Sequence, residues 1–261
     1  MKSTAAFLGY NPRSFAPKPI PAFIGSEFMP RMSASQIKVQ LDELIAQAEL
    51  VEPDLANRIR EFKRWIVKKK DGLLDSKPYV LDLLQEIIQD SRFWLIIKPL
   101  SSIERLELYQ ENNISLAKQY WFDVLFPTWL HERDPQLPIW KQKIMAGEFR
   151  NTDDATITQM ERAITAQQGS VVRRYILDLS MATDLLIAGN QQALCVQLTS
   201  VTGQWLPEKV EKWQKVLMHW QILRGLMLSY AMVNTDYPSL AKVALQHSDT
   251  LAPGSYTVVN M

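Results

Sequence analysis

The amino-acid sequence predicts an α+β protein that is mostly helical, in which an N-terminal helical region precedes a small mixed-sheet α/β core. Three observations support this prediction. Apolar residues recur at helical spacing through most of the first 150 residues. Strand-like runs bounded by turn signals concentrate after that point. The chain of 261 residues has only nine glycines, which favours helices over a loop-rich all-β fold.

The composition is typical of a soluble globular protein. Hydrophobic residues make up 47% of the chain, so a sizeable core can be buried. The net charge of +1 predicts no strong global attraction to nucleic acid but allows a local basic patch. The one cysteine, Cys195, cannot form an internal disulfide, which indicates a reducing compartment, and we expect a cytoplasmic protein. No apolar run approaches the roughly 20 residues that span a bilayer, so no membrane contact is expected.

Residues 1–33 predict an extended Pro-rich arm. Its prolines remove backbone donors and bias the preceding residues toward extended conformations. The segment also holds more apolar side chains than a free linker should. We therefore expect either an arm that packs on a surface, its own or that of a protein partner, or a flexible tail.

Residues 34–150 predict a helical domain. Apolar stripes at helical spacing indicate helices near residues 37–45, 52–69, 78–88, 103–111, 116–126 and 138–144. Pro53 and Pro78 suit the first turns of two of these helices, and serines precede three others as candidate caps. Residues 93–97 form a continuous apolar run that fits either a helix or a buried strand.

Residues 151–261 predict an α/β core, and the domain boundary is expected within the polar, turn-prone residues 148–155. Helices are expected at 156–168 and 207–224, and strands at 184–188, 194–201 and 226–233. Residues 171–179 keep a helical period, although this stretch could hold a strand. Gly189 and Asn190 give a strong turn signal between the first two strands. A short helix at 240–245 and a strand at 256–259 complete the prediction.

Polar residues occupy defined places on the first two predicted strands. Asp184 opens the first strand, and Gln197 and Thr199 share one face of the second because side chains alternate along a strand. These residues and the order of elements around them resemble the core of the PD-(D/E)XK nuclease superfamily, over residues 156–233. That family places an Asp at the start of one strand and Glu-x-Lys on the next, where this chain has Gln-Leu-Thr.

The resemblance implies a metal-dependent phosphodiesterase site with altered chemistry. Asp184 matches the family's strand-opening Asp, which ligates Mg²⁺. Glu161, on the preceding helix, matches an acid that some members place there. Gln197 takes the position of the family's Glu, as in some members, and would offer a neutral amide oxygen as a weaker ligand. Because Mg²⁺ prefers hard oxygen ligands, it is the cofactor that this metal set of Asp184, Glu161 and Gln197 would take.

Thr199 stands where the family has Lys, and this departure matters most. A threonine carries no charge and cannot stabilise the negative charge that develops during hydrolysis. Lys209, on the predicted helix at 207–224, could reach back toward the sheet as relocated lysines do in this family. The alternative is that Lys209 belongs to a solvated face, that Asp184 ends a helix, and that Gln197 and Thr199 are the polar face of an edge strand.

A second candidate site is the basic helix at 52–69. It carries four basic residues interleaved with aromatic rings, which is a pattern that could contact nucleic-acid phosphates: Arg60, Lys63, Arg64 and Lys68. The alternative is an amphipathic helix with a solvated basic face.

A dense aromatic cluster at 120–140 predicts either core or a buried interface with a protein partner. Its members are Tyr120, Trp121, Phe122, Phe126, Trp129 and Trp140. The three histidines are far apart in the sequence and show no zinc-ligand spacing, so no cofactor besides Mg²⁺ is expected.

Three hypotheses for function follow. The leading one is a degenerate, catalytically weak or inactive nuclease-like module that binds nucleic acid or a protein partner. The second is an active Mg²⁺-dependent nuclease with a relocated basic residue. The third is a non-catalytic helical scaffold or assembly protein, whose arm and aromatic cluster dock on a partner.

Overall fold

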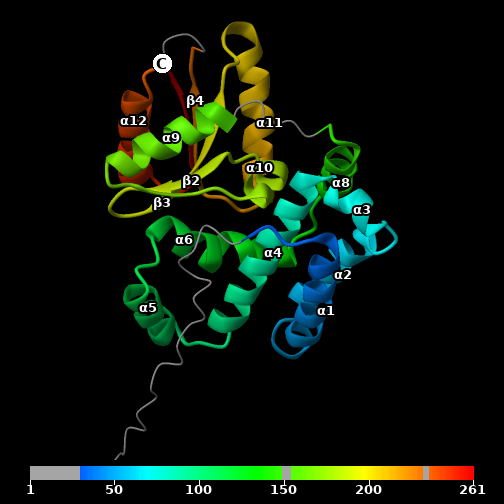
Figure 1. Ribbon diagram of the computed structural model, residues 1–261. Coiled ribbons are helices and arrows are strands. Elements are labelled where there is room, and N and C mark those ends of the chain that lie inside the picture. The colour runs from blue at the N-terminus through cyan, green and yellow to red at the C-terminus, as the bar shows by residue number, and fades with distance from the viewer. Residues whose placement is uncertain (1–29, 149–153, 232–234) are drawn as a thin grey trace, which may run out of the picture. The chain divides into compact units, whose positions relative to one another are not determined.

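The computed structural model describes residues 30–148, 154–231 and 235–261 (Figure 1). Residues 31–261 form one compact unit, which is mostly helical and contains a five-stranded mixed sheet. The predicted α+β class is therefore confirmed. The predicted arm lies outside the described residues, apart from residues 30–33.

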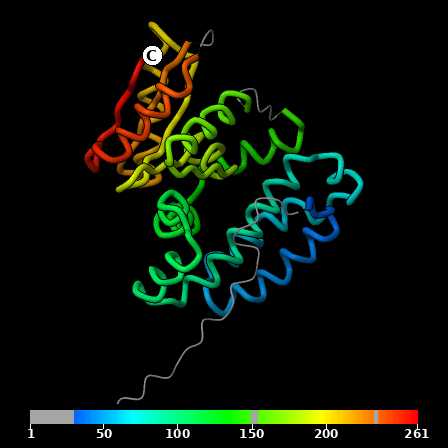
Figure 2. The backbone as a smooth tube through the Cα atoms, turned by 60° about the vertical axis from the view of Figure 1, so that its left-hand side comes forward, coloured from blue at the N-terminus to red at the C-terminus, as the bar shows by residue number. Residues whose placement is uncertain are grey.

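The first part of the unit, residues 30–148, is built from helices. They are α1 (Ala34–Val51), α2 (Pro53–Ile66), α3 (Asp71–Asp75), α4 (Pro78–Ile97), α5 (Ser102–Glu111), α6 (Leu116–Tyr120), the π-helix η2 (Trp121–Leu125), α7 (Phe126–His131) and α8 (Leu137–Ala146). Ser33 caps α1 through a capping box with Gln36, as the sequence allows. Figure 2 shows α1 and α2 packed side by side with α4 next to α1. The ambiguous run at 93–97 belongs to α4.

The segment at 116–126 differs from its prediction as a single helix. It is divided into α6 and the π-helix η2, which leads directly into α7. Pro127 lies in the first turn of α7. Proline has no N–H and its ring crowds the carbonyl four residues earlier, and the wider π-turn removes that conflict. The π-turn also directs Trp121, Phe122 and Leu125 into the interior.

The predicted aromatic cluster forms part of the hydrophobic core. Five of its rings are between 0% and 4% exposed, namely Trp121, Phe122, Phe126, Trp129 and Trp140. Phe62 from α2 joins them, with its ring centroid 6.0 Å from that of Trp129. These rings are already covered by the chain itself, so the expected docking of a protein partner through them is not available in the folded protein.

The second part of the unit carries the sheet. Its elements are α9 (Asp154–Ala166), β1 (Ser170–Val172), α10 (Tyr175–Met181), β2 (Leu185–Ala188), β3 (Ala193–Thr199), the short helix η3 (Gly203–Trp205), α11 (Leu206–His219), β4 (Arg224–Ser229), α12 (Tyr237–Thr250) and β5 (Ser255–Asn260). The strands lie in the order β1-β2-β3-β4-β5. The pairs β1–β2 and β2–β3 are antiparallel, whereas β3–β4 and β4–β5 are parallel.

Two element boundaries in this part differ from the prediction. The stretch at 171–179 contains both the end of β1 and the start of α10. The helix predicted to run to residue 224 ends at His219, and the following turn places Gln221 at a positive φ of 55°. Arg224 and Gly225 therefore begin β4, and that strand ends at Ser229 and not near residue 233.

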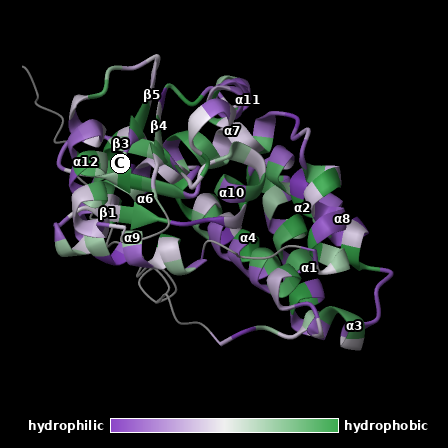
Figure 3. Cartoon of the chain, turned by 90° about the horizontal axis from the view of Figure 1, so that it is seen from above, coloured by the Kyte–Doolittle hydropathy of each residue, from purple (hydrophilic) through white to green (hydrophobic). Residues whose placement is uncertain are grey.

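Helices cover both faces of the sheet (Figure 1). On one face, α9 and α12 pack on alternate strand residues such as Leu185, Val196 and Leu226. On the other face, Leu217 and Trp213 of α11 lie against Gly225. Figure 3 shows hydrophobic strands between helices whose outer sides are hydrophilic. The alternation of side chains then places Gln197 and Thr199 on the α11 face of the sheet.

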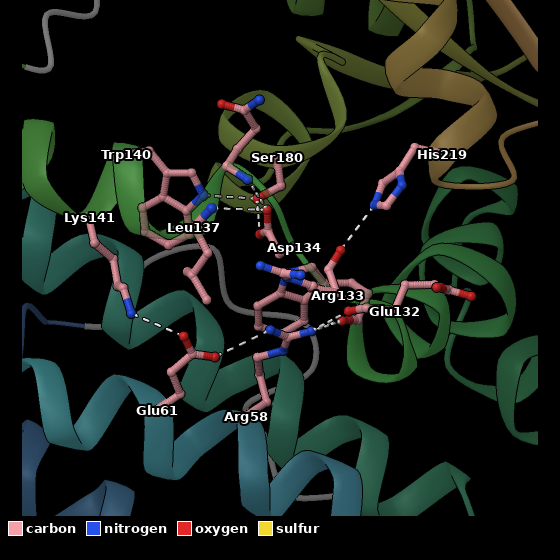
Figure 4. Close-up of polar contacts among 12 residues, drawn as sticks. Arg58, Glu61, Glu132, Arg133, Asp134, Leu137, Trp140, Lys141, Ser180 and His219 are labelled. Atoms are coloured by element: carbon pink, nitrogen blue, oxygen red, sulfur yellow. Dashed lines mark hydrogen bonds and ion pairs between the residues drawn. The ribbon is translucent and has the colours of Figure 1, made fainter.

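Buried polar contacts join the helical part to the sheet part (Figure 4). Asp134 Oδ2 accepts a hydrogen bond of 2.6 Å from Ser180 Oγ on α10. The same Ser180 Oγ accepts a hydrogen bond of 3.1 Å from Trp140 Nε1. Asp90 on α4 pairs with Arg174 at 2.9 Å. The expected boundary near residue 150 thus separates two kinds of secondary structure within one compact unit.

Candidate functional site

The candidate site lies where β2 begins and β3 ends, on the face of the sheet that α11 covers. Four of the predicted residues lie there as two hydrogen-bonded pairs, Asp184 with Gln197 and Thr199 with Lys209. The carboxyl ends of the parallel strands β3 and β4 lie at the same edge, which is where α/β sheets commonly place their ligand sites.

Asp184 is held against β3 by three hydrogen bonds. Its main-chain N–H donates to the carbonyl of Val196 at 2.9 Å. Its Oδ2 accepts from the main-chain N–H of Leu198 at 2.6 Å and from Gln197 Nε2 at 2.7 Å. The Asp184 carboxylate therefore holds the start of β2 against β3, and this structural role does not depend on catalysis.

The orientation of the Gln197 amide follows from its two partners. Its nitrogen Nε2 donates both to Asp184 Oδ2 at 2.7 Å and to the carbonyl oxygen of Leu198 at 3.2 Å. An amide oxygen in that place would face two acceptors, so the hydrogen-bond network requires the nitrogen. The amide group thus lies between two oxygen atoms that could otherwise share a cation.

Lys209 turns toward the sheet. Its ammonium Nζ donates to Oγ1 of the buried Thr199 at 2.8 Å. The other two lysines on this side of α11, Lys212 and Lys215, belong to a solvated helix face. Lys212 pairs with Glu208 at 2.6 Å and lies in solvent. Lys215 forms a similar exposed pair with an acid four residues earlier. One lysine of the three therefore places its positive charge beside Thr199.

The environment of Asp184 favours its neutral form. The pKa of Asp184 is raised to about 7, chiefly by burial and also by the nearby carboxylate of Asp178. The hydrogen bonds from Leu198 and Gln197 and the charge of Lys209 act in the opposite direction. At neutral pH a substantial fraction of this side chain is therefore protonated, and a protonated carboxyl group is a poor metal ligand.

The structure places Glu161 apart from this group. Glu161 belongs to α9, which packs on the opposite face of the sheet from Gln197 and Thr199. The acid that does lie near Asp184 is Asp178 on α10, which was not predicted as a site residue. Ala182, with φ and ψ both at 48°, ends α10 and turns the chain so that these two acids approach each other. A sequence pattern does not reveal a left-handed alanine.

The predicted nucleic-acid stripe on α2 is largely engaged within the protein. Arg60 forms an ion pair with Glu49, and Lys63 forms one with Asp42, both acids being on α1. Arg64 and Lys68 are exposed. The four residues therefore do not present one continuous basic surface.

Comparisons with known proteins leave the site to be interpreted from its own chemistry. No protein-family model, curated protein or solved structure matches this chain. Within the described segments, moreover, there is no helix with the length and apolar character needed to cross a membrane.

Proposed function

We propose that the sheet-bearing part of this protein is a nuclease-like module of the PD-(D/E)XK type whose metal position has been closed, so that it binds a partner without catalysis. The order of its elements supports this proposal, since α9 precedes a mixed sheet and α11 crosses from β3 to the parallel strand β4. The clustering of Asp184 with Gln197 at the start of β2 supports it further.

One observation carries the catalytic part of the proposal. The Gln197 amide nitrogen contacts both Asp184 Oδ2 and the Leu198 carbonyl oxygen. Mg²⁺ would have to lie about 2.1 Å from each oxygen that it binds, and the amide group occupies that space. The amide satisfies the same oxygens by donating hydrogen bonds, so the local fold is stable without a metal ion.

The binding part of the proposal concerns what the altered site still offers. Lys209 retains a positive charge at the edge of the sheet, and the aromatic ring of Trp205, 65% exposed, precedes it by four residues. A cation beside an exposed ring suits a nucleic-acid strand, through one phosphate and one stacked base. A protein partner is the alternative, and binding of a fluorescent single-stranded oligonucleotide that weakens in Trp205→Ala separates the two.

Metal titration tests the closed site. In calorimetry we expect Asp184→Asn to leave Mn²⁺ binding by the protein unchanged, because the wild-type site takes none. We expect Gln197→Glu to create a Mn²⁺ site that disappears in the double variant Gln197→Glu, Asp184→Asn. Wild-type Mn²⁺ binding that is lost in Asp184→Asn would overturn the closed-site proposal.

The position of Lys209 favours a second candidate function, an active nuclease with a relocated lysine. Under this hypothesis Asp184 and a divalent ion would position water, and Lys209 would stabilise the negative charge that develops on the phosphate. Cleavage of plasmid DNA with Mn²⁺ should then be lost in Asp184→Asn and in Lys209→Met. The solvent-facing variant Lys212→Met is the matched control and should cleave normally. Absence of cleavage by the wild-type protein rejects this hypothesis.

A further inference from the structure

Three metal-binding side chains meet at a place remote from the sheet. Glu52 lies between α1 and α2, Asp54 lies in the first turn of α2, and His131 is the last residue of α7. One donor atom from each of the three lies within 4.8 Å of the other two. Nothing in the nuclease-like site uses these residues.

The spacing of these donors fits one metal ion. His131 Nε2 lies 3.5 Å from Asp54 Oδ2 and 3.9 Å from Glu52 Oε1. Zinc binds imidazole nitrogen and carboxylate oxygen at about 2.0–2.2 Å, so two tetrahedral ligands lie roughly 3.4 Å apart. The observed separations are slightly larger than that value, and both exceed a normal hydrogen bond. Shifts of up to about half an ångström would bring His131 and each carboxylate to the separation that a shared ion requires.

The burial of Glu52 provides a second and independent observation. Its side chain is only 6% exposed, so the carboxylate is largely removed from solvent. Its near charge is Lys98, whose ammonium lies 2.5 Å from Oε2. The other oxygen, Oε1, is the one on the side of His131. Lys98 compensates one oxygen of this buried carboxylate, and a cation on the side of His131 would compensate the other.

The charges also favour a cation. Lys98 balances one of the two carboxylates, so the group keeps one net negative charge when the imidazole is neutral. Asp54 and His131 are 53% and 45% exposed, which gives an ion a path from solvent and leaves room for a bound water. His131 also lines a surface pocket of about 370 Å³.

We propose that Glu52, Asp54 and His131 form a binding site for a divalent transition-metal ion. One imidazole nitrogen with two carboxylate oxygens favours zinc or a similar ion over Mg²⁺ or Ca²⁺, which prefer ligand sets made only of oxygen. The bound ion would connect the junction of α1 and α2 to the end of α7. This proposal is independent of the function proposed for the sheet.

Titration with zinc and cobalt tests the site. Calorimetry of the full chain with Zn²⁺ should show one ion per molecule, and Co²⁺ should give visible d–d absorption. His131→Ala and Asp54→Asn should each weaken Zn²⁺ binding by about 100-fold or more, a larger loss than outer-shell changes cause. The exposed His219 provides the matched control, and His219→Ala should bind Zn²⁺ as the wild type does.

Two outcomes would overturn the proposal. One is the absence of stoichiometric Zn²⁺ binding by the wild-type protein. The other is Zn²⁺ binding that His131→Ala leaves unchanged. Circular dichroism of each variant shows whether it is folded, and Asp54→Asn, an exposed and nearly isosteric change, gives a result even if His131→Ala fails to fold.

Discussion

Replacing Asp184 with asparagine should stabilise the protein, and should do so only above acidic pH. Asparagine keeps an oxygen that can accept the hydrogen bonds from Leu198 and Gln197. It removes the negative charge that burial and Asp178 oppose. The substitution therefore deletes an unfavourable ionisation while it leaves the local contacts in place.

The size and sign of this effect follow from proton linkage. The pKa of Asp184 is raised from 3.8 to about 7 on folding, and each unit corresponds to about 1.36 kcal/mol. Between these two values the folded state binds more protons than the unfolded state, so the free energy of unfolding falls as pH rises. The wild-type protein should lose on the order of 4 kcal/mol through this window, and Asp184→Asn should not.

Urea unfolding at pH 4, 6 and 8 measures the difference directly. The two proteins should be nearly equal at pH 4, and the variant should be more stable by an amount that grows toward pH 8. Asp236→Asn provides a control of opposite sign, because the hydrogen bond from Ser239 lowers the pKa of Asp236. If Asp184→Asn proves less stable than the wild type at pH 8, the carboxylate is stabilised by charge and the reasoning is refuted.

Two further predictions concern packing and buried charge. In Gly225→Ala the new Cβ would lie 2.4 Å from a leucine methyl group of α11, so thermal unfolding should show that the free energy of unfolding falls by about 1–3 kcal/mol. The control Gly72→Ala, which has nothing within 4 Å of its new Cβ, should be close to neutral. Arg174→Met should cost about 3–5 kcal/mol in denaturant unfolding at pH 7, because it leaves the buried Asp90 without its bidentate partner. The control is Arg173→Met, which removes an exposed ion pair with Asp154 and should lower the free energy of unfolding by less than about 1 kcal/mol. Equal losses in the two arginine variants would contradict the assignment of a buried charge.

Local patterns predicted much of the fold because they act over short distances. The serine cap and apolar stripe of α1 are both present, and so is the turn between β2 and β3. The prediction failed where tertiary packing decides a boundary. Gly225 looks like a helix end, but it is needed in β4 as the flat surface on which α11 packs. The π-turn before α7 likewise depends on Pro127, because a proline can be accommodated by a kink, a helix end or a π-turn and the local sequence does not decide among them.

The candidate site separates into parts that the sequence could and could not predict. Gln197 meets Asp184 because a tight turn fixes the register of two antiparallel strands, and that register follows from the sequence. The place of Glu161 depends on which face of the sheet α9 covers, and no local pattern contains that information. His131 Nε2 lies 3.9 Å from Glu52 Oε1, although α2 to α7 separate the two residues in the chain. Their convergence can be seen only in the folded chain.

If the site is closed to metal as proposed, Asp184 and Gln197 still have a structural role. Asp184 and Gln197 connect the start of β2 to β3 through side-chain hydrogen bonds, so they contribute to the sheet whether or not a metal is bound. A glutamate at 197 would place a second carboxylate within 2.7 Å of the first, and only a cation or a shared proton would relieve that repulsion. Glutamine removes this requirement. Under the proposed function, this glutamine would both occupy the metal position and leave the local fold independent of a metal ion.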